Sequence, residues 1–192
     1  VVYWDEAWEV LVRRQGRYAA LAAAQDRTLS APNLVAWIRE GLSPEQKQEQ
    51  ERQLEKRIQK EPGLGVAHAL LGYLRYDQAT GGCLNEAHDL EQEANKAQAA
   101  GRPEEAANLA QQAQARIRRS RELLTQSVEL FQQDLRLCPG QSRSRYGIGR
   151  SLLWLGRPAD AREWFVRSAA IDPLNWLHAR ESVLYYQDYV GA

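Results

Sequence analysis

The sequence lacks methionine altogether, and it contains only two cysteines and two phenylalanines. A chain without Met, even at its start, is what we expect of a segment processed or excised from a longer protein. We expect Cys83 and Cys138 to be free thiols, with a disulfide between them as the alternative in an exported protein. Two cysteines leave the compartment open between the cytoplasm and a bacterial periplasm.

An excess of charge of one sign is also missing, as are long apolar runs. The 25 basic residues are balanced by 25 acidic residues, whereas nucleic-acid-binding proteins gain most of their affinity from an excess of Lys and Arg. No stretch reaches the roughly 18 apolar residues that a membrane-spanning helix needs. The opening residues 1–12 are amphipathic, unlike a signal peptide. We therefore expect no nucleic-acid partner, no membrane span and no targeting segment within this chain.

Val and Ile runs of strand length are missing, while the strong helix formers Ala, Leu, Gln, Glu and Arg dominate. The sequence therefore predicts an all-α protein. Ser43 and Pro44 are typical of a helix start, and Gly81-Gly82 is typical of a helix end. Apolar spacing and these breakers predict helices over residues 3–25, 31–40, 43–60, 64–79, 84–99 and 176–189.

Residues 103–137 contain neither Gly nor Pro after the opening Pro103, and apolar residues recur through them at near-helical spacing. One uninterrupted helix over this range would be about 50 Å long at ~1.5 Å per residue. We favour that single helix over two helices with a break near residues 118–120.

A repeat pattern is clearest between residues 142 and 175. Counted from Gly149, small or apolar landmarks follow at +7, +12, +16 and +24, namely Gly156, Ala161, Phe165 and Pro173. This stretch resembles the 34-residue tetratricopeptide repeat, in which small residues let paired helices approach and an aromatic residue fills the gap between them. The turn at residues 156–161 has a second copy at residues 101–106. A weaker copy of the repeat covers residues 1–34, and a partial copy includes Leu71 and Gly72.

The resemblance implies a tetratricopeptide-like α–α superhelix of antiparallel helical hairpins with one unusually long helix. Residues 1–62 would form degenerate N-terminal helices. Residues 63–192 would form hairpins with the long helix, at about 103–137, and a C-terminal capping helix. Together they would make one continuous array.

The same resemblance implies a concave groove lined by the first helix of each hairpin. By the family's positions, Arg143, Tyr146, Arg150 and Leu153 face this groove, and we add Trp154 because Trp is enriched in interfaces. The arginine fork suits carboxylates, and Tyr provides a rigid contact. The Lys and Asn pattern of chaperone-binding tetratricopeptide clamps is not reproduced. Ordinary solvent-exposed surface is the alternative for all five residues.

Motifs that would indicate chemistry are missing. The three histidines, His68, His88 and His178, show no paired metal-ligand spacing, and there is no Walker A or G-x-S-x-G motif. Gly147-Ile148-Gly149 falls inside an expected helix, where close helix packing explains the glycines. We expect no catalytic residues, no metal and no cofactor.

These observations predict a non-enzymatic protein–protein interaction scaffold or assembly factor that binds a protein or peptide partner through the groove. The long helix would be a second contact surface, and a homo-oligomer formed through it is left open. The sequence also leaves open a periplasmic or envelope-associated assembly or secretion component, an excised regulatory domain, and an enzyme subunit whose site is built from scattered residues.

Overall fold

The computed structural model describes residues 3–4, 9–10 and 43–171. The predicted helix at residues 31–40, the predicted capping helix at residues 176–189 and most of the predicted helix at residues 3–25 lie outside this part of the chain. Apart from one pair of very short strands, every described element is a helix. The prediction of an all-α protein is confirmed at that level.

The prediction of a helix over residues 3–25 is wrong where it can be compared. Strand β1 (Tyr3–Trp4) pairs antiparallel with strand β2 (Glu9–Val10), and Tyr3 lies opposite Val10. Aromatic and β-branched residues of this kind favour extended backbone. Here that preference prevails over the apolar spacing that suggested a helix.

Helix α3 (Pro44–Lys60) begins as its sequence predicts. The Ser43 side chain accepts a hydrogen bond from the Gln46 backbone N–H, and the Gln46 side chain accepts one from the Ser43 backbone N–H at 2.8 Å. This reciprocal capping box pairs two backbone donors that the helix itself leaves unpaired. The helix is polar, and Leu54 is the apolar residue that it buries fully.

Helix α4 (Gly65–Asp77) continues through a π-helical turn, η1 (Gln78–Cys83), directly into helix α5 (Leu84–Ala99). The prediction that Gly81-Gly82 ends a helix is therefore wrong. A π turn disturbs the usual hydrogen-bond ladder, and here side chains bond to one carbonyl before the turn and to one within it. Thr80 Oγ1 donates to the Tyr76 carbonyl at 3.0 Å, and Asn85 Nδ2 donates to the Gly81 carbonyl at 3.0 Å.

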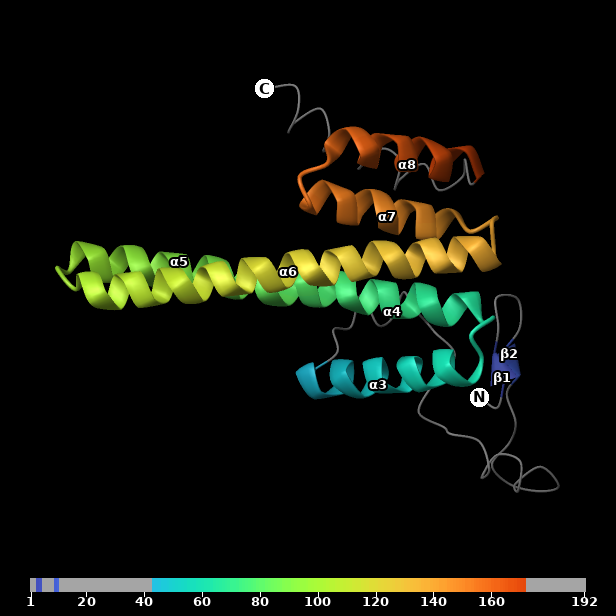
Figure 1. Cartoon of the computed structure of the whole chain (residues 1–192), viewed down its shortest axis with the longest axis horizontal. Helices are drawn as coiled ribbons and strands as arrows, with labels where there is room; N and C mark the ends of the chain where they lie inside the picture. The colour runs from blue at the N-terminus through green and yellow to red at the C-terminus, as the bar shows by residue number, and fades with distance from the viewer. Residues whose placement is uncertain (1–2, 5–8, 11–42, 172–192) are drawn as a thin grey trace, which may run out of the picture.

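Helix α6 (Pro103–Leu137) spans 35 residues without a break. A tight turn at Gly101, with φ of 73°, reverses the chain after α5, so that α6 runs back along both α5 and α4. Figure 1 shows α5 and the neighbouring part of α6 projecting beyond the other helices. We call this projecting hairpin, residues 84–120, the arm. Small residues fill its interior, namely Ala87, Ala94, Ala97, Ala106 and Ala113.

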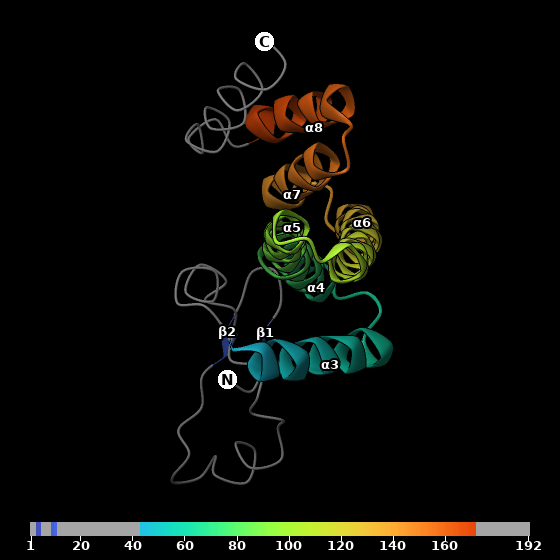
Figure 2. The same cartoon turned by 90° about the vertical axis from the view of Figure 1, so that its left-hand side faces the viewer.

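Helices α7 (Ser142–Trp154) and α8 (Pro158–Ile171) follow as a hairpin. Gly156 occupies the left-handed region with φ of 75°, and Pro158 opens α8, as the sequence predicts. In Figure 1 the helices α8, α7, α6, α4 and α3 succeed one another from top to bottom. Figure 2 shows α4 and α7 on one side of the stack, with α6 on the other.

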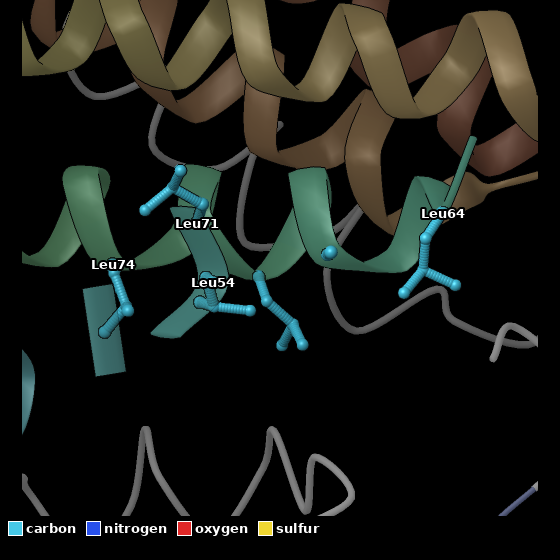
Figure 3. Close-up of a cluster of buried hydrophobic side chains, with 6 residues drawn as sticks. Leu54, Leu64, Leu71 and Leu74 are labelled. Atoms are coloured by element: carbon cyan, nitrogen blue, oxygen red, sulfur yellow. The ribbon is translucent and has the colours of Figure 1, made fainter. Parts of the chain in front are cut away.

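The core lies between successive helices and falls into three clusters. Leu54 of α3 packs against the apolar side of α4 and against Leu64, which directly precedes α4 (Figure 3). Phe131 of α6 packs with α7 and α8, and Leu123 and Leu124 pack around the π turn with Leu155. The expected close packing of Gly147 and Gly149 is confirmed, because a Cβ at Gly147 would stand 2.5 Å from the Phe131 ring and one at Gly149 would stand 2.4 Å from the Phe165 ring.

We predict that Gly147→Ala lowers the free energy of unfolding by about 1–3 kcal/mol, because the new methyl group overpacks against the Phe131 ring. This loss should exceed the gain of about 0.5–1 kcal/mol that Ala brings to a helix interior. Thermal and urea denaturation followed by circular dichroism would measure the change. Gly82→Ala is the control, since its Cβ would meet nothing within 4 Å. Equal stability loss in both variants would contradict the packing argument.

Candidate functional site

The predicted groove residues lie on one helix, α7, whose position is set by buried polar contacts with α6. Ser144 Oγ donates a hydrogen bond to the Asp134 carboxylate, and both side chains are buried. Ser151 Oγ lies 3.2 Å from Ser127 Oγ, and Ser127 Oγ also lies 2.9 Å from the Gly72 carbonyl, to which it donates. These bonds join α4, α6 and α7, and they specify how the helices align along their axes.

The structure brings the predicted residues of α7 against two tyrosines of α4. The Arg150 guanidinium lies 5.0 Å from the centre of the Tyr76 ring and 5.9 Å from the centre of the Tyr146 ring. Trp154 Nε1 donates a hydrogen bond to the Tyr76 hydroxyl at 3.0 Å, and Trp154 remains 47% exposed. We call the surface formed by six residues the aromatic–arginine surface; they are Tyr73, Tyr76, Arg143, Tyr146, Arg150 and Trp154.

The predicted residues differ in their exposure. Arg143 and Arg150 are exposed, whereas Tyr146 is half-buried and its ring centre lies 5.6 Å from that of Phe165. Leu153 is half-buried and packs with the Phe131 cluster, so it supports the surface from beneath. The Arg143 carbonyl accepts a 2.9 Å hydrogen bond from the Tyr73 hydroxyl.

Burial and nearby arginines act in opposite directions on the two tyrosines of α4. Burial raises the pKa of Tyr73 well above its usual range, and the positive charges of Arg143 and Arg150 oppose that rise. Burial likewise raises the pKa of Tyr76, opposed by Arg150 and by the Trp154 hydrogen bond. Both hydroxyls therefore keep their protons near neutral pH, where Tyr73 donates to a carbonyl and Tyr76 accepts from an indole.

The sequence pattern alone did not identify Tyr73 and Tyr76, because they lie about 70 residues before α7. A signal for them exists. Leu71-Gly72 resembles Ile148-Gly149, so Tyr73 follows its glycine as Arg150 follows Gly149. Aligning the two glycines would have placed Tyr73 and Tyr76 on the same face as Arg150.

Ion pairs next to this surface tie α3 to α4. Arg75 pairs with Glu51 at 2.5 Å and with Glu55 at 2.9 Å, and Lys47 pairs with Asp77 at 2.5 Å. These three carboxylates are therefore neutralised by cations other than the arginines of α7.

The described residues hold little that suggests chemistry. Among them, no group of three or more His, Cys, Asp or Glu side chains is placed to bind a metal ion. Nor does this part of the chain contain a helix long and apolar enough to cross a membrane. Cys83 and Cys138 are free, as predicted, and each is half-buried. Burial and the nearby Glu86 carboxylate raise the pKa of the Cys83 thiol, which makes it a poor nucleophile at neutral pH.

No protein-family model matches this chain, and no curated protein matches it either. The resemblance to tetratricopeptide repeats therefore depends on the residues themselves.

We predict that Ser144→Ala lowers the free energy of unfolding by about 1–3 kcal/mol, because the buried Asp134 carboxylate loses a donor. Chemical denaturation would measure the loss. Ser168→Ala is the matched control, since its half-buried hydroxyl donates to the neutral Ser142 carbonyl at 2.8 Å. Ser168→Ala should lower the free energy of unfolding by only about 0.5–1.5 kcal/mol. A smaller effect for Ser144→Ala than for the control would show that the buried carboxylate does not depend on this bond.

Proposed function

We propose that this chain is a non-enzymatic scaffold or assembly factor that holds a protein partner on the aromatic–arginine surface. The observation that carries the proposal is Arg150, an exposed arginine stacked on Tyr76 and Tyr146, beside a Trp154 that is 47% exposed. Tyr, Trp and Arg are the residue types that contribute most to protein interfaces.

The surface is pre-ordered, which lowers the cost of binding. Stacking holds the Arg150 guanidinium in place, and the bond from Trp154 to Tyr76 orients both rings. Side chains already fixed before a partner arrives lose less conformational entropy on binding, by ~0.5–1.5 kcal/mol for each long side chain.

We further propose that the fold is tetratricopeptide-like and that one of its repeats is interrupted. Gly149 packs against Phe165, sixteen residues later, and Pro173 follows eight residues after that. Gly72 packs in the same way against Phe131, which is followed after eight residues by Pro139. The second pair has the same contact and the same ending as the first, but 59 residues separate its glycine from its phenylalanine.

The extra residues of the interrupted repeat are the arm and its root, which we define as residues 79–83 and 121–124. Both α4 and α6 continue outward as a long hairpin in place of a short turn. The arm has a polar outer surface, because none of the exposed large apolar residues of the described chain lies on it. The arm would thus be an addition to the array and not part of its core.

Replacing residues 79–124 by Gly-Arg-Pro, the turn found at residues 156–158, should give a folded protein. The change restores the sixteen-residue spacing between Gly72 and Phe131. We expect a cooperative unfolding transition and a helical far-UV spectrum, both measured by circular dichroism. The control deletes residues 79–124 without adding the turn, which leaves too few residues to connect the helices and should unfold the protein. An unfolded turn variant would contradict the interrupted-repeat proposal.

A Tyr146→Ala, Arg150→Ala double variant tests the scaffold function. Wild-type protein should capture a partner from the source lysate. The double variant should capture at least tenfold less of that partner, since hot-spot truncations cost about 2 kcal/mol or more of binding free energy. Circular dichroism would first establish that the variant folds. Arg118→Ala, Arg121→Ala is the control pair, because both side chains are exposed on α6 away from the surface. Equal capture by the wild type and the double variant would contradict the proposal.

A further inference from the structure

The two arginines of the aromatic–arginine surface stand seven residues apart on α7. Residues at this separation share a helix face, two turns apart, so their positions along the helix differ by about 10.5 Å. Tyr146 lies between them, close to the same face. Arg143 and Arg150 are exposed, and neither forms an ion pair with any residue in the described ranges.

Both positive charges lie on the side of α7 that faces α4. The Arg143 carbonyl accepts a 2.9 Å hydrogen bond from the Tyr73 hydroxyl, which places the start of α7 against α4. The Arg150 guanidinium lies over the Tyr76 ring. A stacked guanidinium keeps its edge N–H donors free for a carboxylate.

Within residues 43–171, the carboxylates near α7 and α4 do not neutralise these two charges. Glu51 and Glu55 pair with Arg75, and Asp77 pairs with Lys47. The Asp134 carboxylate is buried beneath and accepts a hydrogen bond from Ser144. The surface therefore offers two cationic forks from positions two helical turns apart, with aromatic rings between and beside them.

We propose that the protein partner of the proposed scaffold function, on which this inference rests, is an acidic, proline-containing extended segment whose two side-chain carboxylates are three positions apart. A polyproline II helix has three residues per turn and rises about 3.1 Å per residue. Positions i and i+3 therefore lie on one side, about 9 Å apart. Flexible arginine side chains span the small difference from about 10.5 Å. Aromatic surfaces such as Tyr76, Tyr146 and Trp154 are the usual docking sites for prolines between such positions.

A spacing test with blocked, fluorescein-labelled peptides examines this inference on the full chain. The first peptide carries Glu-Pro-Pro-Glu between Gly-Ser flanks, and the second carries the same residues as Glu-Glu-Pro-Pro. The third replaces both Glu by Gln. Fluorescence anisotropy at low salt should show the first peptide binding at least fivefold more tightly than the second. The first peptide should also bind at least tenfold more tightly than the third, since hydrogen bonds between charged groups are stronger than hydrogen bonds to the neutral Gln amide.

The variants connect the preference to the two arginines. Arg143→Gln and Arg150→Gln should each reduce the spacing preference to less than twofold, and Arg121→Gln, at an exposed position of α6, should keep it. Equal binding of the first two peptides, or no binding of any peptide, would overturn the inference. A labelled oligothymidine that binds as tightly as the first peptide would also overturn it, since the surface would then recognise anions in general.

The two proposals can fail separately. If the peptides show no spacing preference while lysate capture still depends on Tyr146 and Arg150, the scaffold function stands and the acidic-pair inference falls. If the spacing preference is present and is lost in Arg150→Gln, the inference stands even where lysate capture fails.

Discussion

The contact on which the structure depends is the one between Phe131 and two glycines. The Phe131 ring is fully buried, and it packs against Gly72 of α4 on one side and Gly147 of α7 on the other. A side chain at either glycine would push a helix away from the ring. Because the ring touches both helices, it sets the distance of α4 and of α7 from α6. Tyr76 and Trp154 can meet only because α4 and α7 are held this close.

Buried hydroxyl groups fix the alignment along their axes of the helices that pack around the Phe131 ring. Apolar contacts are non-directional, so Phe131 by itself would allow α7 to slide along α6. The bonds of Ser127 to Gly72 and of Ser144 to Asp134 have direction, and a shift along the axis would leave buried polar groups unpaired. The ring thus sets the spacing of the helices, and the hydroxyls set their alignment. The aromatic–arginine surface needs both, since its contacts join two helices.

Sequence reasoning correctly predicted those features of the fold that depend on a few consecutive residues. The start of α3 at Ser43 and Pro44 and the turn before α8 at Gly156 could be predicted, because each signal acts within a few residues. It failed at Gly81-Gly82, where packing of α5 against α6 outweighs the glycines' preference for a helix end. At the candidate site, Arg143, Tyr146 and Arg150 were predicted from the groove-facing positions of the family that residues 142–175 resemble. Their partners on α4 were missed, because the arm separates the two helices in sequence and the likeness of Leu71-Gly72 to Ile148-Gly149 covers only two residues.

The root of the arm and the aromatic–arginine surface both involve the C-terminal end of α7, at two neighbouring residues. Leu155 packs with Ala79, Leu123 and Leu124 at the root of the arm, while Trp154 bonds to Tyr76 on the surface. The root therefore helps to position Trp154. The tip of the arm projects beyond the other helices (Figure 1), and buried alanines fill the interior of the arm. Changes in arm length beyond the root should accordingly leave the surface in place, so the two features of the molecule can vary independently.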